Sequence, residues 1–480
     1  MILRCFVLPL SIFLSMYFSI IATRLTNSPT LGFVELAPLL LYVAILLVTT
    51  LVLYYARFNG NLSVVSVVLI LCGIGMVLQF RVGSLQIGAS ISQLVYPISI
   101  LVLLATYLIG RHGRIAKLEP YWVIFMVLAL LSICFVMIFG RKYRGAIYLP
   151  GNINPVEIVK PLLVVSIATI LAGHSALLTR GFLGIPLPPL NIIWTVIIIW
   201  SPAMGLLILQ GDMGMFALLN AVLIVMLYGA TRRLLYLVGG FAVIIALGGL
   251  LMPLTTRGAA RMAAWHDPFS VATGLGWQQL QGLVALYSGG LLGSGIGAGT
   301  PTVVPIVESD FVYIVLGEEL GFIGCICVVL LYIAFVAAGM RVAENAQGKT
   351  FEQSVYQRTV ATGLTACIAI QSLLNIGGVT TAIPLTGIPL PLLSHGGSSL
   401  IATMLMVGIL LAISDYTPLP KHQKKKKASR TNKSIIKRKA NRPKFEKKST
   451  HDKPFGGEAN VLGADSASKK HSSRANKKGC

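Results

Sequence analysis

Charged residues are scarce in this 480-residue chain, since Asp, Glu, Lys and Arg make up 11% of it, against 55% hydrophobic residues. Soluble domains usually carry about 25% charged residues, so this deficit argues against an ordinary water-soluble protein and indicates that lipid surrounds most of the chain. The seven cysteines have no spacing typical of a metal site. The sequence also lacks the patterns of a soluble nucleotide-binding fold and of a serine triad.

Long apolar runs are what the sequence has in place of charge. A membrane helix needs about 20 mainly apolar residues to cross a core of about 30 Å. Twelve runs meet this condition, near 3–22, 36–55, 63–80, 92–110, 121–139, 156–174, 190–209, 211–229, 233–252, 311–340, 357–378 and 398–414. They predict an all-α integral membrane protein with about 12 transmembrane helices. The first run could instead be a cleaved signal peptide, but its length and the lack of a small-residue cleavage site favour a retained helix.

Positive charge is concentrated at the C-terminal end. From Lys421 onwards the chain has 20 Lys and Arg against 4 Asp and Glu, a large part of the formal net charge of +23. Because Lys and Arg favour the cytoplasmic side, we predict that both termini are cytoplasmic, although Arg141, Lys142 and Arg144 oppose this orientation. We expect 416–480 to be a disordered basic tail that lies on anionic lipid of the inner leaflet. Docking of a cytoplasmic partner is an alternative, and nucleic-acid binding is the weakest interpretation.

Two segments on the predicted outer face are not spans. Residues 253–310 are too polar to cross the membrane, and their aromatic and apolar content predicts a short interfacial helix near 276–288. Residues 379–397 are rich in Pro and Gly, which excludes a regular helix. The chain thus divides into N-terminal helices at 1–139, a core at 140–415 that includes the loop 253–310, and the tail at 416–480.

Ionisable residues inside apolar runs are costly and are therefore candidates for function. Glu157 and Lys160 are three residues apart, so they share one helical face and can form an ion pair. That pair could be structural or could act directly. Asp212 lies between two apolar runs, where it could cap the second helix or face Lys160 across a cavity.

Further candidates lie in and after the long outer segment. Asp310 precedes an apolar run, where a carboxylate can cap a helix or act as a general base, and spacing alone does not decide between these roles. The other polar or aromatic candidates are Arg261, Trp265, Asp267, Gln278, Gln281 and Glu318. The run GGLLGSGIGAG at 289–299, named here the glycine loop, could approach a phosphate, but such loops also simply turn.

Taken in order, five motifs resemble those of the SEDS family of bacterial cell-wall proteins, which includes RodA, FtsW and SpoVE. The resemblance covers about 150–415. The motifs are NPVEIVK (Asn154 to Lys160), QGDMG (Gln210 to Gly214), WHDPF (Trp265 to Phe269) with the glutamines and glycines that follow, SDFVYIVLGEELG (Ser309 to Gly321), and a closing signature from Asn375 to Ser398 that contains Ser394, Gly396, Gly397 and Ser398.

The sequence departs from the family pattern at several positions. Asn154 stands for the usual Gln, Gly211 for Pro and His395 for a common Tyr. Two helices precede the ten that are usual for the family. The resemblance therefore points to a divergent branch, and it leaves open whether the role is in elongation, division or sporulation.

What the resemblance implies is a peptidoglycan glycosyltransferase in the bacterial cytoplasmic membrane, which polymerises lipid II at the outer surface. Asp310 would be the general base that deprotonates the acceptor sugar. Arg261, Lys160 or a divalent cation, Mg or Mn, would neutralise the leaving group. The resemblance also implies a partner, a class B penicillin-binding protein that cross-links the new glycan. This chain has no penicillin-binding signatures of its own, which indicates that it does not carry the cross-linking chemistry. The alternatives are a lipid II flippase, which would depend on Glu157, Lys160 and Asp212, and a non-catalytic scaffold for a transpeptidase.

Overall fold

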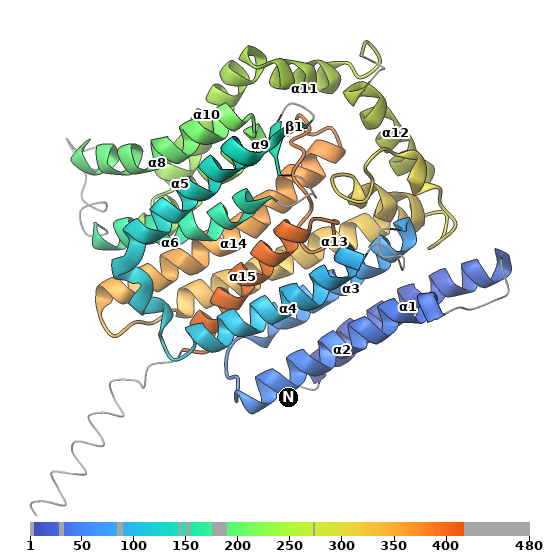
Figure 1. Ribbon diagram of the computed structural model, residues 1–480, viewed down its shortest axis with the longest axis horizontal. Coiled ribbons are helices and arrows are strands. Elements are labelled where there is room, and N and C mark those ends of the chain that lie inside the picture. Colours follow the sequence, from blue (N-terminus) through green and yellow to red (C-terminus); the bar gives the residue numbers. More distant parts are fainter. Residues whose placement is uncertain are drawn as a thin grey trace, which may run out of the picture. The chain divides into compact units, whose positions relative to one another are not determined.

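A computed structural model describes residues 4–27, 33–83, 90–143, 146–149, 154–174, 190–271 and 274–416. These residues are almost entirely helical, as predicted, with one pair of three-residue antiparallel strands among them (Figure 1). They belong to a compact unit that spans Met1–Pro418. The predicted disordered tail, from 417 onwards, lies outside the described residues.

Each of the twelve predicted spans coincides with a helix. These helices are α1 (Arg4–Asn27), α2 (Phe33–Tyr55), α3 (Leu62–Val82), α4 (Ser90–Gly110), α5 (Trp122–Phe139), α6 (Val159–Gly173), α8 (Leu190–Gln210), α9 (Met213–Thr231), α10 (Leu234–Leu251), α13 (Val312–Asn345), α14 (Phe351–Val379) and α15 (Gly397–Ser414). Ten described helices are long and apolar enough to cross a membrane, and Leu94–Gly110 and Trp194–Gln210 are shorter apolar helices. The protein is therefore a multi-pass membrane protein.

Shorter elements connect the spans. They are the 3-10 helices η1 (Ile115–Tyr121), η3 (Pro155–Ile158), η4 (Met252–Leu254) and η5 (Pro301–Val303), the strands β1 (Arg141–Tyr143) and β2 (Ala146–Tyr148), and the helices α11 (Thr256–His266) and α12 (Leu275–Ser288). The predicted interfacial helix near 276–288 is α12. Helix α11 was not predicted. It begins after Thr255, whose side chain accepts a hydrogen bond from the Gly258 N–H (3.1 Å) and so caps the helix.

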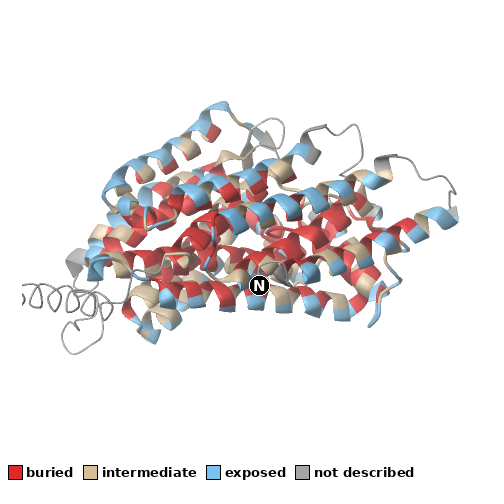
Figure 2. Cartoon of the chain, turned by 90° about the horizontal axis from the view of Figure 1, so that it is seen from below, coloured by how far each residue is buried: buried red, intermediate tan, exposed pale blue. Residues whose placement is uncertain are grey.

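Burial differs strongly between helices that are equally apolar. In α3, 83% of the span is buried inside the protein, whereas none of α10 is. Figure 2 shows buried residues concentrated in the middle of the bundle and exposed ones on its outer helices. An apolar surface in a membrane protein can face either other helices or lipid, so α3 is an internal helix and α10 faces the lipid.

The packing order brings distant parts of the sequence together. Helix α15 packs on α4, α14 packs on α13, α9 and α6, and α1 packs on α3. In Figure 1 the two N-terminal helices α1 and α2 lie at the periphery, beside α3 and α4. The outer ends of α3, α13, α14 and α15 thereby lie close enough for their loops to share hydrogen bonds.

Helix α13 is interrupted two turns after its start, where Gly321 has φ 67° and ψ −167°. The glycine loop supplies the backbone partners that the missing turn would have provided. The Ser294 N–H donates to the Glu318 carbonyl (2.9 Å), and the Phe322 N–H donates to the Gly290 carbonyl (2.9 Å). Because an unpaired backbone group in hydrocarbon costs several kcal/mol, this loop is what makes the break tolerable inside a span.

Candidate active site

Asp310 lies in a turn before α13, and Phe311, not Asp310, is the residue at the N-cap position of that helix. The Asp310 carboxylate accepts a hydrogen bond from the Ser309 hydroxyl (3.1 Å), and its carbonyl accepts one from Asn375 Nδ2 (2.9 Å). The side chain is half-buried. The cap interpretation is therefore not supported, and the residue is partly exposed.

Arg261 reaches the neighbourhood of Asp310 from the long outer loop. It is buried on α11, and its Nη1 donates to the carbonyl of Thr386 (2.7 Å). Next to Thr386, Gly387 has φ +68°, and a Cβ added there would lie 2.6 Å from Arg261 Nη2 and 3.6 Å from Asp310 Oδ2. The Arg261 guanidinium and the Asp310 carboxylate thus border the same glycine. A positive charge therefore lies beside the candidate base.

The backbone that leads to Asp310 is held by the Gln79 side chain of α3 and by two residues of the second outer loop. The Glu308 carbonyl accepts hydrogen bonds from Gln79 Nε2 (3.0 Å) and from the His395 backbone N–H (2.7 Å). The Ser394 hydroxyl donates to the Ser309 carbonyl. Such contacts fix a turn that has no helical hydrogen bonds of its own, which is how a reactive group is held ready.

An apolar groove of about 950 Å³ leads toward this region. Side chains of α8, α9 and α10 line most of it, together with Leu374 of α14 and the segment Ile383–Thr386. Its polar members include Asn220, whose amide already bonds Trp200 and Phe216. Because α10 faces the lipid, the groove suits a hydrocarbon chain, and its lining includes Thr386, whose carbonyl binds Arg261.

Glu157 and Lys160 form the predicted ion pair, with the Lys160 ammonium donating to Glu157 Oε2. Lys160 also donates to Gln371 Oε1 (2.7 Å), and Gln371 Nε2 in turn donates to the carbonyl of Pro389 (2.8 Å). Lys160 is fully buried. The pair is thus joined through Gln371 to the second outer loop, 379–397.

Asp212 caps α9, as one of the two sequence interpretations predicted, because its side chain accepts a hydrogen bond from the Met215 N–H (3.0 Å). The preceding Gly211 has φ +82° and separates α8 from α9. The left-handed backbone there needs glycine and explains how two adjacent apolar runs become two helices.

Three of the predicted site residues, two in the long loop and one in α15, hold neighbouring segments together. Trp265 Nε1 donates to the Thr381 carbonyl (2.8 Å), and Gln278 Nε2 donates to the Pro305 carbonyl (2.9 Å). Ser398, in the closing signature, accepts a hydrogen bond from the Asn154 N–H (2.8 Å). These contacts join the loops around the site without reaching the Asp310 carboxylate.

The other predicted site residues lie at helix ends or on α12. Asp267 is exposed and ends α11, where it accepts the Phe269 N–H (3.0 Å) in a turn. Gln281 is half-buried on α12. Gly396 is the N-cap residue of α15, and Gly397 is its first residue.

The Glu318 and Glu319 carboxylates accept hydrogen bonds from the glycine loop and from the residue that follows it. Glu318 Oε1 accepts the Thr300 N–H (2.7 Å), and Glu319 Oε2 accepts the Gly297 N–H (2.9 Å). A Cβ at Gly293 would lie 2.2 Å from the Glu319 carbonyl oxygen, so the glycines permit close approach to the break in α13. The structure accounts for the glycine loop without a phosphate.

Sequence reasoning missed the residues at the outer end of α3. Gln79 and Arg81 are both at least half-buried, and both bond to outer loops from a helix that looked like a plain apolar span. The sequence did contain a signal for them, because an amide and a guanidinium two residues apart in an apolar run need hydrogen-bond partners. Gln371 was missed for the same reason.

The model of the FtsW, RodA and SpoVE family, described as cell cycle proteins, matches residues 90–418. This chain belongs to that family. The match includes Asp310, Arg261 and the whole closing signature, while α1, α2 and α3 precede it.

Curated relatives carry names that agree with the family. The peptidoglycan glycosyltransferase RodA of Mycobacterium tuberculosis is 33% identical over 56% of this chain and 57% of its own length. A probable peptidoglycan glycosyltransferase FtsW of Trichlorobacter lovleyi is 35% identical over 61% of this chain and 74% of its own length. Stage V sporulation protein E of Bacillus subtilis is 34% identical over 55% of this chain and 69% of its own length. The chain thus spans little more than half the length of the mycobacterial relatives.

Two solved structures share the fold. A chain in a structure of a peptidoglycan synthase complex superposes with a TM-score of 0.57 at 22% identity, covering 75% of this chain and 99% of that chain. RodA of Thermus thermophilus superposes with a TM-score of 0.52 at 21% identity, with the same coverage. The FtsW/RodA/SpoVE fold is thereby confirmed.

Proposed function

We propose that this protein is a peptidoglycan glycosyltransferase that polymerises lipid II at the outer face of the bacterial cytoplasmic membrane, with both termini in the cytoplasm. The observation that carries the proposal is the junction between the groove and Asp310. Thr386 lines the groove and accepts the Arg261 hydrogen bond, and the adjacent Gly387 borders the Asp310 carboxylate. Lipid II presents a polyprenyl chain, a diphosphate and a sugar in that order. This order matches the apolar groove, the Arg261 guanidinium and the Asp310 carboxylate.

In this proposal Asp310 accepts the proton from the 4-hydroxyl of the acceptor sugar. That oxygen attacks the anomeric carbon of the growing chain, the bond from this carbon to the diphosphate breaks, and the lipid diphosphate leaves with its electron pair. Inversion at the carbon gives a β-1,4 link. Arg261 stabilises the negative charge that develops on the leaving diphosphate, because a buried guanidinium acts more strongly there than in water.

A divalent cation, Mg or Mn, fits this site only together with the substrate. The described residues contain no group of three or more His, Cys, Asp and Glu side chains that could hold a metal ion. Mg²⁺ in proteins is commonly bound by one or two carboxylates plus substrate phosphates. We therefore propose that any cation arrives with the diphosphate and is held near Asp310, where it would help to neutralise charge.

The proposed partner is a class B penicillin-binding protein that cross-links the glycan. The similarity to a chain of a peptidoglycan synthase complex supports this proposal at the level of fold. Large apolar side chains are exposed on α12 and the glycine loop, among them Trp277, Tyr287 and Leu292. An exposed apolar surface on an outer loop suits a protein partner. We likewise propose anionic inner-leaflet lipid as the ligand of the basic tail.

The test is polymerisation of purified lipid II by the full-length protein with its cognate transpeptidase, comparing wild type with Asp310→Asn. General-base catalysis contributes about 10²- to 10⁴-fold, so the variant should lose that much activity while its thermal stability is unchanged. Glu344→Gln is the matched control, because Glu344 is an exposed carboxylate at the other end of α13.

Two results would contradict the proposal. Absence of polymer from a folded wild-type complex would favour transport or scaffolding over polymerisation. Equal polymer from wild type and Asp310→Asn would keep the enzyme and assign the base to another residue.

A further inference from the structure

The outer end of α3 bonds to both outer loops. Gln79 is fully buried there, and its Nε2 donates to the carbonyls of Glu308 (3.0 Å) and Leu393 (3.0 Å). Glu308 precedes Asp310 by two residues in the long loop, and Leu393 belongs to the second outer loop. One buried amide therefore joins the segment that carries Asp310 to the second outer loop.

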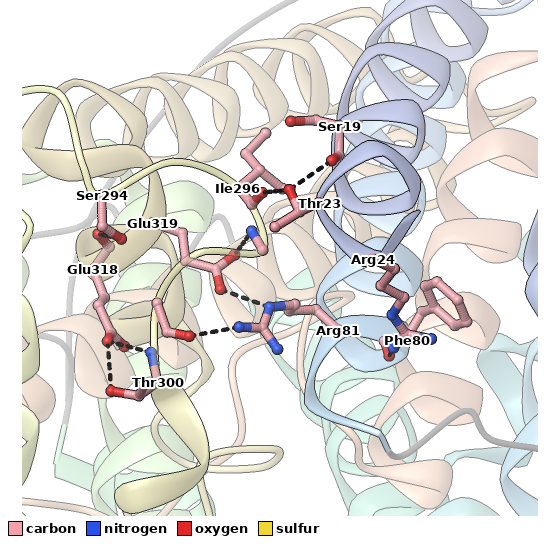
Figure 3. Close-up of polar contacts among 12 residues, drawn as sticks. Ser19, Thr23, Arg24, Phe80, Arg81, Ser294, Ile296, Thr300, Glu318 and Glu319 are labelled. Atoms are coloured by element: carbon pink, nitrogen blue, oxygen red, sulfur yellow. Dashed lines mark hydrogen bonds and ion pairs between the residues drawn. The ribbon is translucent and has the colours of Figure 1, made fainter. Parts of the chain in front are cut away.

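Arg81, two residues further along α3, holds the glycine loop. Its Nε bonds Glu319 Oε1 (2.8 Å), and its Nη2 donates to the carbonyl of Gly299 (2.6 Å). Figure 3 shows the guanidinium between these two acceptors, with Glu319 also bonded to the loop. Gly299 is the last residue of the glycine loop, and from it the chain runs on to Asp310. Arg81 thus fixes the start of the segment 300–311, and Gln79 binds near the end of the same segment.

We propose that Gln79 and Arg81 are positioning residues for Asp310. The segment 300–311 contains one short 3-10 helix, η5, and otherwise turns, so its own hydrogen bonds do not define a rigid element. Its conformation therefore depends on groups from other elements, and Gln79 and Arg81 of α3 bind near its two ends. Both residues bond backbone carbonyls there, and both lie outside the family match at 90–418. The inference rests on the proposed function, and it names residues that the family match does not reach.

Helix α1 offers the matched control. Arg24 donates to the Phe80 carbonyl (3.3 Å) and lies 4.3 Å over the Phe80 ring, so it binds α1 to the same end of α3. Figure 3 shows Arg24 beside Phe80, on the side of α3 away from Glu319. Removing Arg24 weakens helix packing in the same place but leaves the backbone that leads to Asp310 bonded.

The experiment compares Gln79→Met, Arg81→Met and Arg24→Met in the full-length protein with its cognate transpeptidase. One readout is kcat and KM for lipid II, and the other is hydrogen–deuterium exchange of the amides in 301–311. A misplacement of about 1 Å costs roughly 10²-fold, so we expect kcat to fall about 10- to 100-fold in the first two variants with KM changed by less than about twofold. Exchange in 301–311 should accelerate in both. Arg24→Met should change neither readout.

Conservative variants separate positioning from folding. Arg81→Lys keeps the ion pair with Glu319 and should recover part of kcat, and Gln79→Asn, one methylene shorter, should fold yet resemble Gln79→Met. Unchanged exchange and unchanged kcat in folded Gln79→Met would overturn the proposal, as would an equal loss in Arg24→Met. If the wild type makes no polymer, the proposed function fails, and the exchange data still decide whether Gln79 and Arg81 fix the segment.

Discussion

Asp310 and the Glu157–Lys160 pair are both built from ionisable residues at the edge of apolar runs, yet the protein treats them in opposite ways. Lys160 is fully buried and bonded to Glu157 and Gln371. The Asp310 side chain is half-buried in a turn beside a lipid-facing groove. The first arrangement buries its charges among protein groups, whereas the second leaves the residue partly exposed.

The difference shows that the type of residue does not determine its role in a membrane protein, whereas its surroundings do. A buried charge is retained only if partners compensate its desolvation, and those partners hold it in place. A catalytic carboxylate needs a fixed backbone and an accessible side chain. Substitutions at the two sites should therefore separate folding from activity.

The largest effect on folding is expected for Lys160→Met. Removing one member of a buried ion pair leaves an uncompensated charge and costs about 3–5 kcal/mol of unfolding free energy. Denaturation of the purified protein in micelles measures this cost. The double variant Glu157→Gln with Lys160→Met removes both charges and should regain most of the stability. If the single variant is as stable as wild type, the pair does not hold the helices together, and the contrast with Asp310 disappears.

A smaller effect, on activity rather than folding, is expected for Arg261→Lys. Lysine keeps the positive charge but loses the planar fork that serves both Thr386 and the neighbourhood of Gly387. A hydrogen bond to a charged group contributes about 1.5–3 kcal/mol, so polymerisation should fall roughly tenfold or more. Kinetics with lipid II measure the loss, and the stability should stay well above that of Lys160→Met. Full activity would remove Arg261 from the proposed charge stabilisation.

The smallest effect is a pH dependence from His395, which lies outside the spans. Burial lowers the pKa of His395 below its ordinary value, and Glu308 opposes the shift. The folded state therefore favours the neutral ring, and the unfolded state binds the proton first as the pH falls through about 6.5. Stability should be constant above that pH and decrease below it until the folded pKa is reached. Thermal unfolding between pH 7.5 and 5.5 measures this, and His395→Gln should abolish the His395 contribution.

The fold was largely predictable because length and hydropathy determine membrane helices almost by themselves. Asp310 could be found by resemblance, but its role could not be derived, because an aspartate before an apolar run also matches a helix cap. The proximity of Arg261 to Asp310 depends on Gly387, which has a left-handed backbone. Gly387 lies 126 residues after Arg261, so no local sequence pattern reveals this contact. The glycine loop was ambiguous for a related reason, since its partner is a break in α13.

Helix α15 is the last span, and its position has a consequence for biosynthesis. It packs on α4, an early helix, and Ser394 just before it bonds the backbone beside Asp310. Chains are made from the N-terminus onward, so the earlier helices are made before this contact exists. A nascent chain that stops before 394 can insert eleven predicted spans and still lack a finished site. The hydrogen bond that holds the turn before Asp310 can thus form only after α14 and the second outer loop have been made.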